Sequence, residues 1–168
     1  IFGHGGIKRT DKDFFSAYVL THILGGSGFG SRLMTELREK NGLTYGVSAY
    51  LASWEKADLI LGQFASSNNT VMEAISIVRK EWAALAERGV TADELQDAKT
   101  FLTGAYPLRF DGNSRIARIL VGMQSQGLPI DYIRTRNAKV NSVTIEDIKR
   151  VSTRILKEKN LYFVIVGR

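Results

Sequence analysis

The chain of 168 residues is the size of one ordinary domain, and its 44% hydrophobic content is enough to close a single buried core. A total of 23 Lys and Arg against 17 Asp and Glu gives a formal net charge of +6, which permits an anionic partner but does not demand one. The absence of cysteine excludes disulfides, thiolate nucleophiles and Cys-ligated zinc, and no apolar run approaches the roughly 18 residues of a membrane span.

The first predicted elements are a strand end and two helices separated by glycines. Residues 1–2 indicate the tail of a strand, and apolar side chains at helical spacing predict a helix over 11–24. Four glycines then fall within 25–30. A second helix is expected over 31–40, because a serine can cap its start and an Asn-Gly pair supplies a left-handed stop after it.

The middle of the chain predicts a hairpin and two long helices. Residues 42–53 and 57–66 are rich in Tyr, Val, Leu and Phe and are joined by a short polar turn, so we expect two strands that pair. A helix with one apolar face is expected over 69–89. A Thr-x-x-Glu capping box opens the next helix, over 91–106, which a proline ends.

The last part of the chain predicts three helices, over 113–126, 131–141 and 145–157, and a short buried strand over 160–167. Because the helices are not alternated strictly with strands, the order predicts an α+β fold rather than a doubly wound sheet. We expect one domain over 1–168, and the opening without Met indicates a piece of a longer protein.

The glycine-rich stretch does not have the pattern of a phosphate-binding loop. Gly25 and Gly30 have the P-loop separation, but Ser31 and Arg32 follow where a Lys-Ser/Thr pair is needed to reach the phosphates and magnesium. No three glycines within 25–30 have the offsets of a dinucleotide fingerprint, and the segment before them predicts a helix instead of a strand. The composition alone therefore indicates a flexible connector between helices.

The segment that follows, "SRLMTELREKNGLTYGV" at 31–47, resembles the signature of the metal-free halves of the pitrilysin, insulin-degrading enzyme and mitochondrial processing peptidase family, the inverted-motif zinc peptidases. In that signature an Arg on a helix precedes a Tyr in a strand by seven residues, as Arg38 precedes Tyr45 here. The "LGG" before the segment, the "TADEL" helix start and the terminal "NLYFVIVG" are also similar. The resemblance implies an antiparallel-rich sheet covered by helices, in a domain that pairs with another around a peptide.

The resemblance places zinc on a partner and no cofactor on this chain. An inverted site needs His-x-x-Glu-His on a helix, whereas this chain has only His4 and His22, 18 positions apart, neither with a ligand at zinc spacing. We expect His4 to be a surface residue in a glycine-rich loop and His22 to pack at the edge of the core. The chain alone is therefore expected to be inactive.

In the family, the corresponding pair contacts the substrate from the metal-free half. The resemblance implies that Tyr45 donates its phenol proton to the scissile carbonyl and that Arg38 binds substrate backbone, which suits an oxyanion donor and a planar guanidinium. Taken without the motif, Arg38 beside Glu36 and Glu39 would be a solvated helix residue, and Tyr45 would be a strand residue that packs on the core.

The glycine-rich stretch has a counterpart in the non-catalytic subunit of the processing peptidase, where it precedes the same "SRL". The resemblance implies a mobile lip that contacts substrate through Gly25, Gly26, Gly28, Phe29 and Gly30, although the stretch is shorter here.

The expected partners are a peptide substrate and a homologous domain or subunit that bears the zinc motif, with no nucleic acid and no membrane span. A structural relative without catalysis, like the core proteins of respiratory complexes, is the main alternative. A nucleic-acid module based on the positive charge lacks interleaved aromatic residues. Relatives of this kind are often found in the bacterial periplasm, and the mitochondrial matrix is the other expected location.

Overall fold

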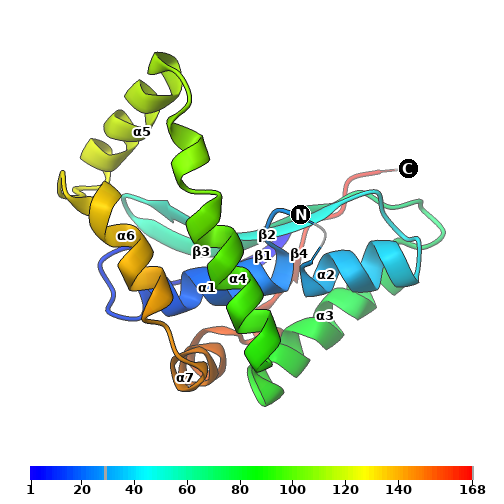
Figure 1. Ribbon diagram of the computed structural model, residues 1–168. Helices are drawn as coiled ribbons and strands as arrows, with labels where there is room; N and C mark the ends of the chain where they lie inside the picture. Colours follow the sequence, from blue (N-terminus) through cyan, green and yellow to red (C-terminus); the bar gives the residue numbers. More distant parts are fainter. Residues whose placement is uncertain (29, 168) are drawn as a thin grey trace.

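The computed structural model describes residues 1–28 and 30–167, and within these ranges four strands form one antiparallel sheet in the order β2-β3-β1-β4 (Figure 1). The strands are β1 (Phe2–Gly5), β2 (Val47–Trp54), β3 (Ala57–Phe64) and β4 (Tyr162–Phe163). The predicted hairpin is confirmed, because β2 pairs with β3 along its whole length around a turn at Glu55 and Lys56.

The helices follow the sequence prediction closely in number and place. They are α1 (Phe14–Gly25), α2 (Arg32–Met34), the π-helix η1 (Thr35–Lys40), α3 (Val71–Arg88), α4 (Ala92–Gly104), the 3₁₀-helix η2 (Pro107–Phe110), α5 (Asn113–Ser125), α6 (Tyr132–Asn141), α7 (Ile145–Ile155) and the 3₁₀-helix η3 (Glu158–Asn160). The predicted α+β fold is therefore confirmed. None of the helices in the described ranges is long and apolar enough to span a membrane.

Helix α1 lies at the centre of the fold, against the sheet and between α4 and α7 (Figure 1). Ala17, Val19 and Leu20, on different sides of this helix, are all fully buried. A helix with apolar residues all round can be stable only inside a protein, so the surrounding helices must cover what the sheet leaves exposed. This arrangement holds the glycine-rich end of α1 next to β2.

Capping residues fix the starts of α4 and α7. Thr91 and Glu94 form the predicted capping box, in which the Glu94 amide donates to the Thr91 hydroxyl and the Thr91 amide donates to the Glu94 carboxylate. Thr144 caps α7 in the same way with Asp147. Because such a box is completed within four residues, its sequence signature is sufficient to predict it.

The prediction that His4 lies on the surface is wrong. His4 belongs to β1, is 7% exposed and packs edge-on against Trp82 of α3. Its Nε2 atom accepts a hydrogen bond from the Trp82 indole at 2.9 Å, and Nδ1 lies 2.6 Å from the Gly5 carbonyl oxygen, to which it donates. Burial lowers the pKa of His4, so the neutral ring is the form that the fold favours.

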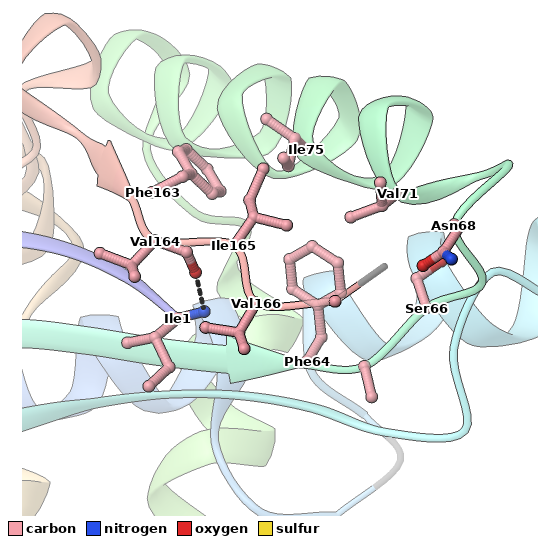
Figure 2. Close-up of a pocket in the computed structure, with 12 residues that line it drawn as sticks. Ile1, Phe64, Ser66, Asn68, Val71, Ile75, Phe163, Val164, Ile165 and Val166 are labelled. Atoms are coloured by element: carbon pink, nitrogen blue, oxygen red, sulfur yellow. Dashed lines mark hydrogen bonds between the residues drawn. The ribbon is translucent and has the colours of Figure 1, made fainter.

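The final strand is shorter and more exposed than predicted. β4 has two residues at the edge of the sheet, and beyond it only the exchange of hydrogen bonds between Val164 and the first residue of the chain continues the pairing. Val166 is 93% exposed. Figure 2 shows that this segment lines an open apolar hollow with Phe64 and the first turns of α3. A strand at the edge of a sheet is paired on one side only, so it remains more exposed than a central strand. The hydrophobicity of the sequence does not show which strand lies at the edge.

Helix α5 projects away from the sheet with η2 (Figure 1). Met123 is the one buried residue among its 13. Helix α5 therefore adds little to the core.

Candidate functional site

Arg38 lies in the last turn of the helical segment that follows the glycines. The segment begins as α2 and continues as the π-helix η1, with Leu33 and Leu37 fully buried beneath it. π-Helical turns are rare and are frequently found at functional sites. The predicted left-handed stop is confirmed, because Gly42 has φ +61° and its amide donates to the Arg38 carbonyl at 3.0 Å. The Arg38 side chain is half-buried at this end of the helix.

Tyr45 lies in the loop between η1 and β2, not in a strand, and its side chain is 96% exposed. The strand ladder begins only at Val47, so the placement of Tyr45 in a strand is wrong. Its exposure also excludes the alternative interpretation, made without the motif, that Tyr45 packs on the core. Leu43, Thr44 and Val47 on either side of it are buried. The Thr44 hydroxyl accepts from the Gly46 amide at 3.1 Å and donates to the Gly46 carbonyl at 2.8 Å, which closes a tight turn. This turn presents the Tyr45 ring to the outside from a fixed loop.

A salt bridge that sequence reasoning missed ties this segment to α4. The Arg32 guanidinium donates to both carboxylate oxygens of Glu94, at 2.5 and 2.8 Å, and to the Gly89 carbonyl at 3.0 Å. Hydrogen bonding to Glu94 raises the pKa of Arg32. Burial of the Glu94 carboxylate opposes its ionisation, but the hydrogen bonds from Arg32 and Thr91 outweigh this effect and lower its pKa.

The glycine-rich stretch divides into two parts. Gly25 is the buried last residue of α1, where an added Cβ would lie 2.7 Å from the Ala49 backbone nitrogen, so it allows close packing of α1 on β2. A Cβ on Gly26 would meet the His22 ring. Gly28, with φ +106°, and Gly30 instead line a cavity beside α4.

Phe29, the apolar contact expected within the stretch, lies outside the described residues. His22 is half-buried and its ring stacks on Phe101 of α4 at a centroid distance of 4.9 Å, which confirms the expected packing at the core edge. Burial lowers the pKa of His22.

The residues present do not fit a zinc ion. In the described part of the chain no group of three or more His, Cys, Asp or Glu side chains is arranged to hold a metal. His4 uses both ring nitrogens for hydrogen bonds with Gly5 and Trp82, and His22 lies on a different element. Neither histidine has the carboxylate and second imidazole that a catalytic zinc requires.

Comparison with known proteins adds a family context to this geometry. Residues 4–102 match the family model described as the peptidase M16 inactive domain. The crystal structure of a peptidase M16 inactive domain from Pseudomonas fluorescens superposes with a TM-score of 0.84 and 29% identity, over 95% of this chain and 38% of that one.

Two curated relatives are similar over most of this chain. The non-peptidase homolog YmxG of Helicobacter pylori is 30% identical over 161 residues, which cover 96% of this chain and 37% of that protein. The mitochondrial-processing peptidase subunit alpha of Bos taurus is 27% identical over 163 residues, 89% of this chain and 30% of that subunit. This chain thus spans about a third of the length of such relatives.

Proposed function

Because the chain belongs to the family of peptidase M16 inactive domains, we propose that it is the metal-free domain of a zinc peptidase assembly, where it helps to bind a peptide and to stabilise the transition state of its cleavage. A partner domain or subunit would bear the His-x-x-Glu-His motif and hold the zinc, which would supply an activated water. This chain supplies side chains from the opposite wall of the chamber.

The observation that supports this proposal best is the exposure of Tyr45. A tyrosine side chain that is 96% exposed between buried neighbours contributes nothing to the core of this domain. The turn closed by Thr44 and Gly46 limits the positions that its hydroxyl can take, as a preorganised donor requires. An exposed phenol on a fixed loop suits a role toward a partner or a substrate.

In the proposed mechanism Tyr45 acts as an oxyanion donor. Its O–H group donates a hydrogen bond to the scissile carbonyl oxygen, on which negative charge develops as the water attacks. Arg38 offers a planar fork of N–H donors to carbonyl oxygens of the same peptide, which fixes the extended backbone. Gly28 and Gly30 belong to the lip under which the peptide enters.

A second candidate function is a catalytically silent relative that serves only as a structural subunit. The non-peptidase homolog of Helicobacter pylori, at 30% identity, favours it. The retained Arg38 and Tyr45 favour the catalytic role, because a purely structural domain gains nothing from an exposed tyrosine at this place.

The rate of peptide cleavage by the assembled enzyme, with wild-type chain and with Tyr45→Phe, tests the proposal. Loss of the hydroxyl should lower kcat by about 100-fold while assembly is unchanged. Tyr50→Phe is a matched control, since Tyr50 is a half-exposed tyrosine on the neighbouring strand β2. Equal rates for all three proteins would favour the structural subunit instead.

A further inference from the structure

A second cavity, of about 580 Å³, lies on the helical side of the fold, where three segments meet. These are the loop before α1 with the first turn of that helix, the loop between α5 and α6, and the end of α6 with the first turns of α7 (Figure 1). Neither Arg38 nor Tyr45 lines this cavity. Its floor is apolar and includes Phe14, Phe15, Leu128 and Val143.

The charged side chains of the lining are four basic and two acidic ones, and both acidic ones already bind an arginine. Asp147 accepts a hydrogen bond from Arg150 at 2.8 Å, and Asp11 accepts one from Arg154 at 2.7 Å. The other three basic side chains form no ion pair in the part of the chain that the structure describes; they are Arg9, Lys12 and Lys139. Because these three residues come from two segments, we call the cavity that they line the basic hollow.

Two of the three cations are held over aromatic rings. The Arg9 guanidinium carbon lies 4.0 Å from the centroid of the Phe14 ring and 5.1 Å from that of Tyr132, whose phenol oxygen accepts from Arg9. The Lys139 ammonium lies 5.7 Å from the centroid of the Phe15 ring. Contact with rings removes water from a cation without neutralising it, and a charge that has lost water is stabilised by an ion of opposite sign.

The shape and chemistry of the basic hollow select its ligand. Its volume lies within the range of about 300–1,000 Å³ that is common for ligand sites, which is far more than one inorganic anion fills. The apolar floor favours a ligand that carries apolar groups beside its negative charge. A bilayer or a nucleic-acid duplex presents a broad convex front, whereas these cations line a concave surface. A peptide segment with acidic and apolar side chains fits both features.

We propose that the basic hollow binds an acidic segment of a partner protein. Its carboxylates would accept charge-assisted hydrogen bonds from Arg9, Lys12 and Lys139. An apolar side chain next to them would lie on Phe15 and Leu128. This site goes beyond the role proposed for Tyr45 and does not depend on it.

Fluorescence anisotropy of a dansyl-labelled Gly-Leu-Glu-Glu-Phe-Gly peptide with the 168-residue chain tests this inference. The same peptide with glutamine in place of both glutamates keeps the shape and removes the two side-chain charges. We expect the glutamine peptide to bind about tenfold more weakly, as for partly desolvated charge-assisted contacts. Equal binding of the two peptides, or no binding of either, would overturn the inference.

Substitutions of exposed lysines then locate the site. Lys139→Gln should weaken binding of the glutamate peptide about threefold, and Lys12→Gln together with Lys139→Gln should bring it to the level of the glutamine peptide. Lys80→Gln is the matched control, because Lys80 is an exposed lysine of α3 that does not line the basic hollow. Circular dichroism checks that each variant is folded. Unchanged binding with Lys139→Gln, or an equal effect of Lys80→Gln, would overturn the site.

Sedimentation with vesicles of phosphatidylcholine and phosphatidylserine distinguishes a lipid surface from a peptide. We expect the chain to sediment with these vesicles no more in the wild type than in the Lys139→Gln variant, because a flat surface does not enter the concave site. Sedimentation that Lys139→Gln reduces would show that the cations bind an anionic membrane surface, and it would overturn the choice of a peptide.

Discussion

Arg32 holds both carboxylate oxygens of Glu94, 62 residues further along the chain, from a position at the first turn of α2. Glu94 completes the capping box of α4 with the same carboxylate. One acidic side chain thus fixes the start of two helices. The segment that carries Arg38 and Tyr45 is connected to α4 through this pair.

Arg32→Lys should destabilise the chain although it keeps the charge, because lysine cannot make two parallel hydrogen bonds to one carboxylate. Both side chains of the pair are less than a third exposed, so we expect the free energy of unfolding in urea to fall by about 1–2 kcal/mol. Arg115→Lys is the control, since Arg115 lies 3.9 Å from Asp111 in an exposed pair. An equal effect of the two substitutions would contradict the importance of the bidentate geometry.

The buried histidines should make stability fall at mildly acidic pH. Burial lowers the folded-state pKa of His4 below its ordinary value of 6.5, so the unfolded state takes up the proton first as pH falls. The stability that neutral His4 contributes to the fold is fully present above pH 6.5. It is lost as pH falls from there through the lower folded-state pKa. Urea unfolding at pH 7.5 and 5 should therefore give a lower free energy at pH 5.

His4→Gln separates the two histidines in this measurement. The pKa of His22 is also lowered by burial, so His22 contributes in the same direction and some pH dependence should remain in the variant. The variant should be less stable at pH 7.5, because the Trp82 hydrogen bond changes, and its stability should depend less on pH. An unchanged pH dependence would contradict the assignment to His4.

Asp13 should be a sensitive position for stability. It is 3% exposed, and its two carboxylate oxygens accept from Arg150 at 2.5 Å and from Arg154 at 2.7 Å, which ties the start of α1 to α7. The hydrogen bond from Arg150 lowers the pKa of Asp13. Asp13→Asn should lower the free energy of unfolding by about 1–3 kcal/mol. Asp111→Asn, at an exposed carboxylate, should change it little.

A neighbouring ion pair, between Asp11 and Arg154, should keep the fold resistant to moderate acid. The hydrogen bond from Arg154 lowers the pKa of Asp11 to about 2 from its ordinary value of 3.8. A depressed carboxyl pKa stabilises the fold fully above the unfolded value and loses this effect as pH falls through the folded value. The stability that this pair contributes should therefore be lost between about pH 4 and pH 2, which thermal unfolding at a series of pH values measures. The Asp11→Asn variant should lose less stability than the wild type over the same range.

Arg38→Lys should affect substrate binding if Arg38 contacts peptide carbonyls. In the assembled enzyme we expect KM to rise about fivefold with little change in kcat, because lysine keeps the charge but loses the fork. Arg88→Lys, at an exposed arginine in the last turn of α3, is the control. A fall in kcat with unchanged KM would place Arg38 in the transition state instead of on the peptide backbone.

Local signals in the sequence were enough for most of the fold. The hairpin, the capping box of Thr91 and Glu94 and the Gly42 stop each depend on residues close together in the chain, so their patterns predicted them. His4 was misplaced because its partner Trp82 lies 78 residues away. Tyr45 was placed in a strand because the alternation of apolar residues begins before the ladder that Val47 starts.

Some residues of the candidate site could likewise be predicted from the sequence, and others could not. The spacing of Arg38 and Tyr45 is contained in one short motif, so the sequence could point to both. The cavity beside Gly28 and Gly30 depends on α4, whose Asp97 and Phe101 have no sequence signal of their own and meet the glycine-rich stretch only after α1 and α4 have packed. Ser31 was predicted as a helix cap, and only the structure shows that its hydroxyl is left unsatisfied.

The contrast between α1 and α5 has a kinetic meaning. Amides of α1, enclosed on all sides, can exchange with deuterated water only when the domain opens globally, whereas α5, with Met123 as its one buried residue, can unfold by itself at small cost. The α1 amides should thus be the slowest to exchange, and those of α5 among the fastest of the helical ones. The domain therefore combines a slowly exchanging centre with an outer helix that can open at small cost.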